Sequence, residues 1–158
     1  VPNSKLILTP SDTASSHLIS DKFDKKGVLN SIKFQSHIKN FNEHLDQYNK
    51  IDIALDTFPY NGVTTSFESI WMGVPVLTIK GYNFISRAGE SINKNLGLDQ
   101  LIAENENDYI EKAIFLSMEK NKILNLRKTV YEKALESPLF DKKKFCNEFF
   151  TSLEEIYN

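Results

Sequence analysis

The sequence predicts an α/β protein in which a mostly parallel sheet carries helices on both faces. Short apolar segments with strand character alternate with helical segments over residues 1–103, and such alternation is typical of parallel sheets. Within this part, a strand, a turn, a helix and a second strand follow one another between residues 51 and 79. Only helical spacing occurs over residues 104–158. We therefore expect a single lobe with an α/β part and an all-helical C-terminal part.

Each predicted strand rests on a short apolar or alternating pattern. These segments lie at residues 5–9, 31–35, 51–55 and 75–79, with a small edge strand at 101–103. Helical spacing and helix start or stop signals predict the connecting elements. They lie at residues 10–26, 41–48, 64–71 and 86–95.

Apolar stripes at helical spacing predict three further helices. They lie at residues 107–119, 121–136 and 141–157. In the last of them, Phe145, Phe149 and Leu153 share one stripe, and Cys146 lies beside it. We expect the aromatic side chains and the thiol to be buried in the core, since a buried free cysteine behaves as a small hydrophobe.

The bulk composition narrows the class of function. The formal net charge of −2, with 41% hydrophobic and 25% charged residues, gives no reason to expect nucleic acid or a membrane surface as partner. The single cysteine excludes an internal disulfide and fits a reducing compartment, so we expect a cytoplasmic protein. No transmembrane run or signal peptide is visible. Because the chain begins at Val1 without Met, we expect a piece of a longer protein.

The segment from Leu55 to Val76 places a helix start at the carboxyl end of a predicted parallel strand. Phosphate binds at such positions in α/β proteins, because free N–H groups and the positive end of the helix dipole meet there. Thr64 and Thr65 would add two hydroxyls and offer several donors to a pyrophosphate. The alternative is that one threonine is only the helix N-cap. The pattern favours neither interpretation, and the two are compatible.

Neighbours of the threonines also have two interpretations each. Glu68 could accept two ribose hydroxyls, or it could be the capping-box partner of Thr65, which the three-residue spacing slightly favours. Asn61 and Gly62 would let the backbone approach a ligand closely, although a plain turn is the simpler interpretation.

Two further polar residues lie near the same predicted edge of the sheet. His44 could stack on a base or donate to a phosphate, although a single histidine is more often a surface or capping residue. Arg87 begins the helix after the fourth strand, where it could contact an anionic ligand or pair with a carboxylate such as Asp56. No metal-ligand spacing, Walker loop or nucleophile–base pair is present, so we expect no metal and no cofactor.

Taken together, these motifs resemble the carboxyl-terminal catalytic lobe of the protein O-GlcNAc transferase and SPINDLY-like family. The resemblance is strongest in residues 52–62 (DIALDTFPYNG), in Thr64 and Thr65, and in residues 70–76 (IWMGVPV). Further matches follow in the same order at Gly81, at residues 86–87, 96–98, 101–103, 108–109 and 137–140, and at the start of the chain. The likeness therefore covers nearly the whole sequence.

The resemblance implies a Rossmann-like parallel sheet in the donor-binding lobe of a two-lobed GT-B glycosyltransferase, a class usually preceded by tetratricopeptide repeats. It further implies that Thr64 and Thr65 contact the pyrophosphate of a nucleotide sugar. Glu68 would take the place of the ribose-binding acid, and His44 would lie against the base.

The expected reaction is an inverting transfer of a sugar, foremost from UDP-GlcNAc, to Ser or Thr of an acceptor protein or peptide. The acceptor-side lobe with its catalytic residues lies outside this sequence, so we expect the chain alone to be inactive.

Four positions depart from the animal enzyme of that family. Val63 replaces a histidine, Glu68 an aspartate, and Gln47 and Phe41 basic residues near the nucleotide. These departures leave the base and the sugar open, with a GDP-sugar as an alternative donor. They also favour a second hypothesis, a non-catalytic binding or assembly module derived from such a lobe. An unrelated GT-B enzyme, such as a sugar-nucleotide epimerase, is a third and weaker hypothesis.

Overall fold

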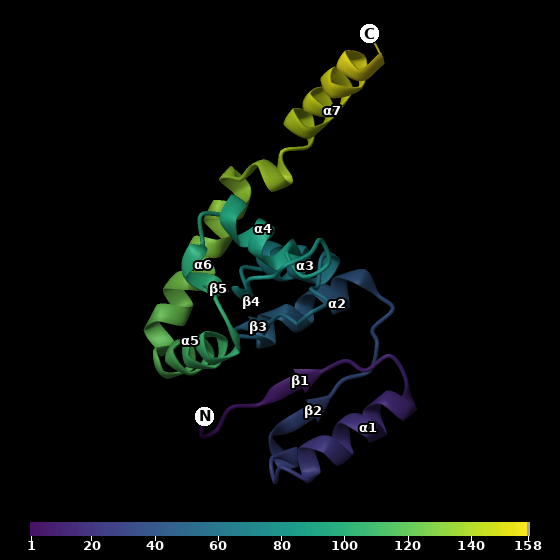
Figure 1. The fold of residues 1–158 in the computed structure, drawn as a ribbon. Helices are drawn as coiled ribbons and strands as arrows, with labels where there is room; N and C mark the ends of the chain where they lie inside the picture. Colours follow the sequence, from purple (N-terminus) through teal and green to yellow (C-terminus); the bar gives the residue numbers. More distant parts are fainter. Residues whose placement is uncertain (158) are drawn as a thin grey trace. The chain divides into compact units, whose positions relative to one another are not determined.

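The protein divides into two compact units, Val1–His44 and Leu45–Asn158, in a computed structural model that describes residues 1–157 (Figure 1). The first unit contains β1 (Leu6–Leu8), α1 (Thr13–Asp24), η1 (Leu29–Ser31) and β2 (Ile32–Phe34). β1 and β2 pair in parallel, with Leu6 opposite Ile32. Asp12 caps α1 by accepting a 2.7 Å hydrogen bond from the Ser15 N–H. This unit is therefore a small βαβ arrangement.

The second unit is built on a parallel sheet in the order β3-β4-β5. β3 (Ala54–Leu55) and β5 (Ile102–Ala103) flank β4 (Val76–Ile79), with Ala54 opposite Val76 and Thr78 opposite Ile102. β3 is shorter than the expected 51–55 segment. The Ile51 carbonyl accepts a hydrogen bond from the Arg127 guanidinium instead of from a neighbouring strand.

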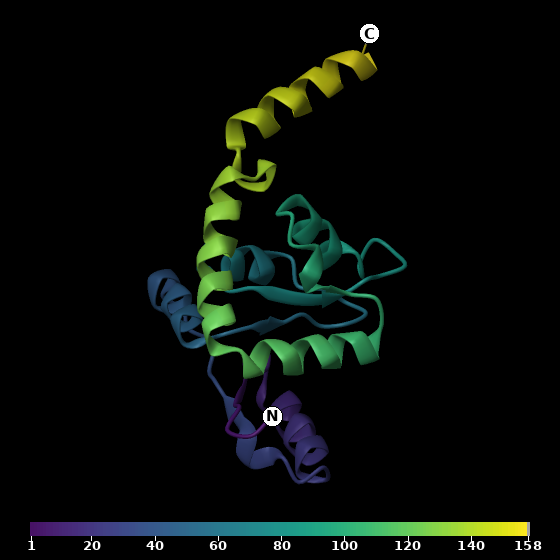
Figure 2. The same ribbon diagram turned by 90° about the vertical axis from the view of Figure 1, so that its left-hand side faces the viewer.

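Helices and 3-10 turns precede, connect and follow the strands of that sheet. α2 (Phe41–Gln47) and η2 (Tyr48–Lys50) precede it, and α3 (Thr64–Trp71), α4 (Ala88–Asn95) and η3 (Asp99–Leu101) connect its strands. From Glu106 onward the elements are α5 (Glu106–Met118), α6 (Lys120–Glu136), η4 (Pro138–Phe140) and α7 (Lys142–Tyr157). Figure 2 shows α5 alongside the strands, with α6 next to it. The predicted class, parallel strands with flanking helices, is confirmed.

The core of the second unit lies between β4 and the helices α3, α4 and α6. Ile70 and Val130 are fully buried there, together with Leu98 and Leu101. β4 is buried along most of its length because helices cover both of its faces, as expected for a central parallel strand. This core holds α3 and α4 against the sheet. Among residues 1–157, no helix has the length and apolar character that a membrane span requires.

The last helix differs from the sequence expectation in its burial. Helical spacing correctly predicts α7, but Cys146 and the stripe containing Phe145 and Phe149 are exposed rather than buried. α7 packs mainly against η4, so no surface in the described chain covers this stripe. The expectation of a core thiol at Cys146 was therefore wrong.

Candidate functional site

The connection from β3 to α3 begins at Asp56, and each of its two carboxylate oxygens accepts a hydrogen bond. Its Oδ1 accepts a 2.8 Å hydrogen bond from the Gly62 N–H, and its Oδ2 accepts a 2.7 Å hydrogen bond from the Thr78 hydroxyl on β4. The Tyr109 hydroxyl on α5 donates to the Asp56 carbonyl at 2.9 Å. Burial raises the pKa of Asp56, and the hydrogen bonds from Gly62 and Thr78 act in the opposite direction. Asp56 thus anchors the loop to the sheet.

Asn61 ties this loop to the next one. The residue is 2% exposed; Nδ2 donates to the Thr57 carbonyl at 2.9 Å, and Oδ1 accepts from the Gly89 N–H at 3.3 Å. Its own N–H donates to the Ile85 carbonyl at 3.4 Å. The amide group therefore belongs to the fold and does not face solvent. The structure shows that this side chain links the β3–α3 loop to α4. Close approach of the backbone at Asn61 and Gly62 to a ligand stays a prediction.

Thr64 and Thr65 lie in the first turn of α3, and both are exposed. The N-cap is Val63, whose side chain makes no capping hydrogen bond, so neither threonine is the N-cap. Within residues 1–157, neither threonine hydroxyl nor the N–H of either residue has a hydrogen-bond partner. The first turn of a helix leaves such donors for an external acceptor. The structure therefore presents four donors at one helix start.

Gly62 lies directly over this turn. A Cβ atom at Gly62 would come within 2.5 Å of Thr65 Oγ1, closer than real side chains approach. The N–H of Gly62 is already bonded to Asp56. Gly62 therefore leaves room for the Thr65 hydroxyl, and its N–H points to the carboxylate beneath the loop.

Glu68 is held by a residue that the sequence did not single out. The Tyr48 hydroxyl donates a 2.9 Å hydrogen bond to Glu68 Oε2. Burial, and then the neighbouring Glu68 carboxylate, raise the pKa of Tyr48 above its usual range, so the hydroxyl stays protonated and donates. Because Val63 is the N-cap, Thr65 and Glu68 do not occupy the N-cap and N3 positions of a capping box. The half-buried Glu68 is positioned by Tyr48.

Arg87 precedes α4 and pairs with a carboxylate on the same helix. Its Nε lies 3.3 Å from Glu90 Oε2, and Lys94 Nζ lies 2.7 Å from Glu90 Oε1. Glu90 is buried, and its pKa is lowered first by the Lys94 hydrogen bond and further by Arg87. The alternative in which Arg87 pairs with a structural carboxylate is therefore confirmed, with Glu90 rather than Asp56 as the partner. The Arg87 side chain remains 59% exposed, so it is still accessible to an anion.

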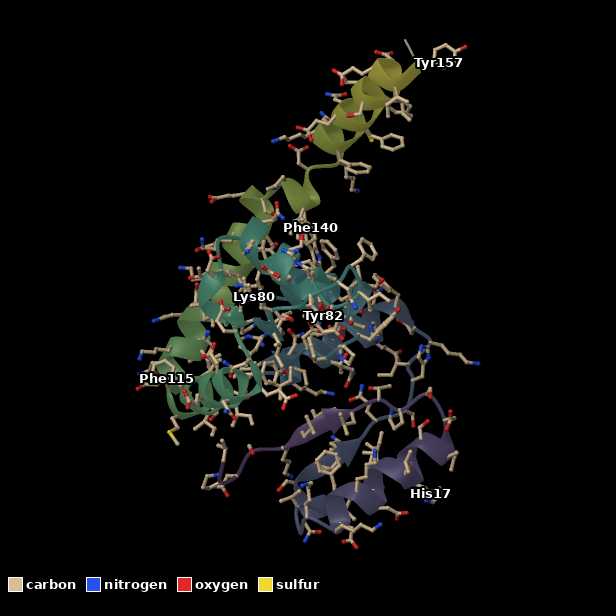
Figure 3. All side chains as sticks on the ribbon, viewed as in Figure 1. His17, Lys80, Tyr82, Phe115, Phe140 and Tyr157 are labelled. Atoms are coloured by element: carbon tan, nitrogen blue, oxygen red, sulfur yellow. The ribbon has the colours of Figure 1, made fainter. Side chains whose placement is uncertain are left out.

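The loop between β4 and α4 adds an aromatic edge. Tyr82 in this loop (labelled in Figure 3) packs edge-on against Phe58 of the β3–α3 loop, with 6.1 Å between the ring centroids. The hydroxyl of the buried Ser86 accepts hydrogen bonds from the N–H groups of Tyr82 and Asn83, at 3.1 and 3.2 Å. The two loops beside α3 are therefore internally fixed and carry exposed aromatic rings.

His44 is the last residue of the first unit, whereas Thr64, Thr65 and Glu68 belong to the second. Its contact with a base stays a prediction. In the part of the chain that the structure describes, no three His, Cys, Asp or Glu side chains are grouped so as to hold a metal ion.

The fold is that of an α/β protein, and a helix start with unpaired donors at the carboxyl edge of its parallel sheet is typical of the positions where such proteins bind anions. The comparison with family models then identifies the family. Residues 1–149 match Glycosyl transferase family 41, and the chain belongs to that family.

Named relatives and a solved structure agree with this membership. A probable SPINDLY UDP-N-acetylglucosamine–peptide N-acetylglucosaminyltransferase from Solanum lycopersicum is 42% identical over 115 residues, which is 73% of this chain and 12% of that protein. A UDP-N-acetylglucosamine–peptide N-acetylglucosaminyltransferase from Caenorhabditis elegans is 30% identical over 115 residues, 73% of this chain and 10% of that protein. The structure of a Thermobaculum terrenum O-GlcNAc transferase variant superposes with a TM-score of 0.90 at 29% identity, covering 99% of this chain and 31% of that one.

Proposed function

We propose that this chain is the donor-binding lobe of an inverting glycosyltransferase that transfers GlcNAc from UDP-GlcNAc to Ser or Thr of a protein. The observation that carries the proposal is the start of α3, where two threonine hydroxyls and their N–H groups have no partner within residues 1–157. The nucleoside diphosphate departs as an anion, and preorganised donors stabilise the developing charge. We propose that these donors make a metal unnecessary.

The other site residues take roles around this anion site. Glu68, oriented by Tyr48, would accept the ribose hydroxyls, and His44 would contact the base. Gly62 leaves space for Thr65, and the exposed Arg87 would meet the anionic part of the donor or the departing phosphate. The names of the relatives, UDP-N-acetylglucosamine–peptide N-acetylglucosaminyltransferases, support UDP-GlcNAc as donor and protein as acceptor.

The chain spans only 12% of the tomato relative and 31% of the solved transferase. We therefore propose that catalysis also needs an acceptor-side lobe, with tetratricopeptide repeats and the catalytic residues outside residues 1–158. The location that we propose is the cytoplasm. Without those parts we expect this chain to bind nucleotide weakly and to turn over no substrate.

Calorimetric titration with UDP, UDP-GlcNAc, GDP and uridine tests the donor site. We expect UDP to bind at least about tenfold more tightly than uridine, because only UDP reaches the donors at α3 with a charged group. Binding should persist in excess EDTA. Equal affinity for UDP and uridine would contradict the assignment of the anion site. Tighter binding of GDP than of UDP would show that the donor carries guanine rather than uracil.

A non-catalytic assembly module is the second candidate. The exposed apolar stripe of α7 and the exposed Val63 at the start of α3 favour it, because exposed apolar patches mark interaction surfaces. The same titration separates the two candidates. Absence of binding for UDP, GDP and their sugars would support the assembly module and reject the transferase lobe.

The Tyr48→Phe variant tests the ribose role of Glu68. Without the Tyr48 hydroxyl, more of the ordering of Glu68 has to occur when the ribose binds. This ordering costs about 1 kcal/mol, so we expect UDP affinity to fall by roughly fivefold. The preference for UDP over 2′-deoxy-UDP should shrink as well, because Glu68 loses one of the contacts that orient it. Tyr60→Phe is the matched control, since the Tyr60 side chain is exposed. An unchanged UDP to deoxy-UDP ratio in Tyr48→Phe would argue against ribose contact by Glu68.

A further inference from the structure

Asp56 lies beneath the anion site and contacts it only through another residue. Its Oδ1 holds the Gly62 N–H at 2.8 Å. Gly62 in turn lies so close to Thr65 that a Cβ atom there would come within 2.5 Å of Oγ1. The backbone of Gly62 therefore lies between the Asp56 carboxylate and the Thr65 hydroxyl.

We propose that Asp56 is a positioning residue that sets the direction of the Thr65 hydroxyl by holding Gly62 against it. The inference rests on the proposed function and deepens it, because it names what orients one of the donors to the diphosphate. Thr65 is exposed, and its hydroxyl has no partner within residues 1–157. The helix backbone allows threonine about two χ1 rotamers, and Gly62 lies on one side of the Thr65 hydroxyl.

The two carboxylate oxygens of Asp56 hold different parts of the structure. Oδ2 accepts from the Thr78 hydroxyl and joins β3 to β4, whereas Oδ1 accepts from Gly62 and fixes the loop. A purely structural role would depend on both bonds alike. A positioning role depends on the Gly62 bond, so Thr78→Val removes the sheet contact while leaving the loop contact in place.

Position 56 needs an acceptor rather than a charge. Burial disfavours the charged carboxylate, and a negative charge near a diphosphate would oppose its binding. An asparagine side chain offers an acceptor oxygen to Gly62 and an amide donor to the Thr78 hydroxyl. Asp56→Asn is therefore expected to preserve the arrangement, and Asp56→Ala to remove it.

The first readout needs no ligand. Three-bond NMR couplings report the χ1 rotamer of Thr65 in wild-type protein, Asp56→Asn, Asp56→Ala and Thr78→Val. We expect Thr65 to hold a single rotamer in wild-type protein, in Asp56→Asn and in Thr78→Val. In Asp56→Ala we expect the couplings to show averaging over several rotamers. An unchanged Thr65 rotamer in Asp56→Ala would overturn the proposal.

The second readout is UDP affinity by calorimetry. We expect Asp56→Asn and Thr78→Val to stay within about threefold of wild type, and Asp56→Ala to bind roughly tenfold more weakly. In a Thr65→Val background, Asp56→Ala should cause no further loss, because the two residues act through one hydroxyl. Additive losses would overturn the proposal.

A second substitution covers the case in which Asp56→Ala does not fold. Gly62→Ala places a Cβ against Thr65 Oγ1, so it should shift the Thr65 rotamer and weaken UDP binding, and Thr65→Ala should suppress that effect. If wild-type protein binds no UDP but the rotamer responds to Asp56→Ala, the proposed function fails and the positioning role stands. If UDP binds and the rotamer does not respond, the positioning role alone fails.

Discussion

Changing Thr64 and Thr65 together to valine is expected to weaken UDP binding by roughly a hundredfold, because each hydroxyl would lose a hydrogen bond to a charged phosphate worth about 1.5 kcal/mol or more. Valine has nearly the shape of threonine, so the helix start should remain intact. The free N–H groups remain in place, so some residual binding is expected. Isothermal titration calorimetry on the wild-type and double-valine proteins measures the difference.

The matched control keeps both hydroxyls. Thr64→Ser with Thr65→Ser should retain UDP affinity within about threefold, and circular dichroism should show equal helix content in all three proteins. If the valine protein bound UDP as tightly as wild type, the threonines would not be donor contacts. If the serine protein lost binding as completely as the valine protein, the lost methyl contacts rather than the hydroxyls would explain the effect.

The helix start that forms this candidate site was predictable from sequence because its signals are local. The helix start at Thr64 follows the turn residues Asn61 and Gly62 and an apolar strand, and the structure begins α3 at Thr64. What the pattern did not distinguish was the cap. Val63 occupies the N-cap without a side-chain bond, which leaves both threonines available.

The contacts that hold the site in place were not predictable from sequence. Tyr48 meets Glu68 across 20 residues, Asp56 meets Thr78 across 22, and Asn61 meets Gly89 across 28. No fixed spacing produces such pairs, because they depend on how the strands and helices pack. Sequence reasoning therefore found the residues at the helix start and missed those that orient them.

Burial of the C-terminal helix shows the same limit. Periodicity correctly gave the helix and its apolar stripe, with Phe145 and Phe149 on one side. It does not say what covers that stripe, and the described chain leaves it exposed. A pattern therefore predicts which face of a helix is apolar, whereas burial depends on a partner surface.

Gly89→Ala is expected to lower the free energy of unfolding by about 3 kcal/mol, as inserting a methyl group into a well-packed site does. A Cβ atom at Gly89 would overlap Thr78 Oγ1 and Asp56 Oδ2, and would lie 2.8 Å from Thr78 Cβ. The first turn of α4 therefore passes directly over the hydrogen bond that joins Asp56 to Thr78. Urea unfolding followed by circular dichroism measures the loss.

Helix propensity alone predicts the opposite sign, since alanine is favoured over glycine in helices by up to about 1 kcal/mol. The overlap should win because Thr78 is fully buried on β4, and its neighbours Asp56 and Gly89 are fixed by Gly62 and Asn61. Ser91→Ala, at an exposed position of the same helix, is the matched control and should change stability by less than about 0.5 kcal/mol.

A stabilised Gly89→Ala protein would show that α4 moves away from Asp56 at little cost. In that case the link between the two loops would be looser than Asn61 indicates, and UDP affinity should be unchanged. If the link is rigid, unfolding stability and UDP affinity should fall together.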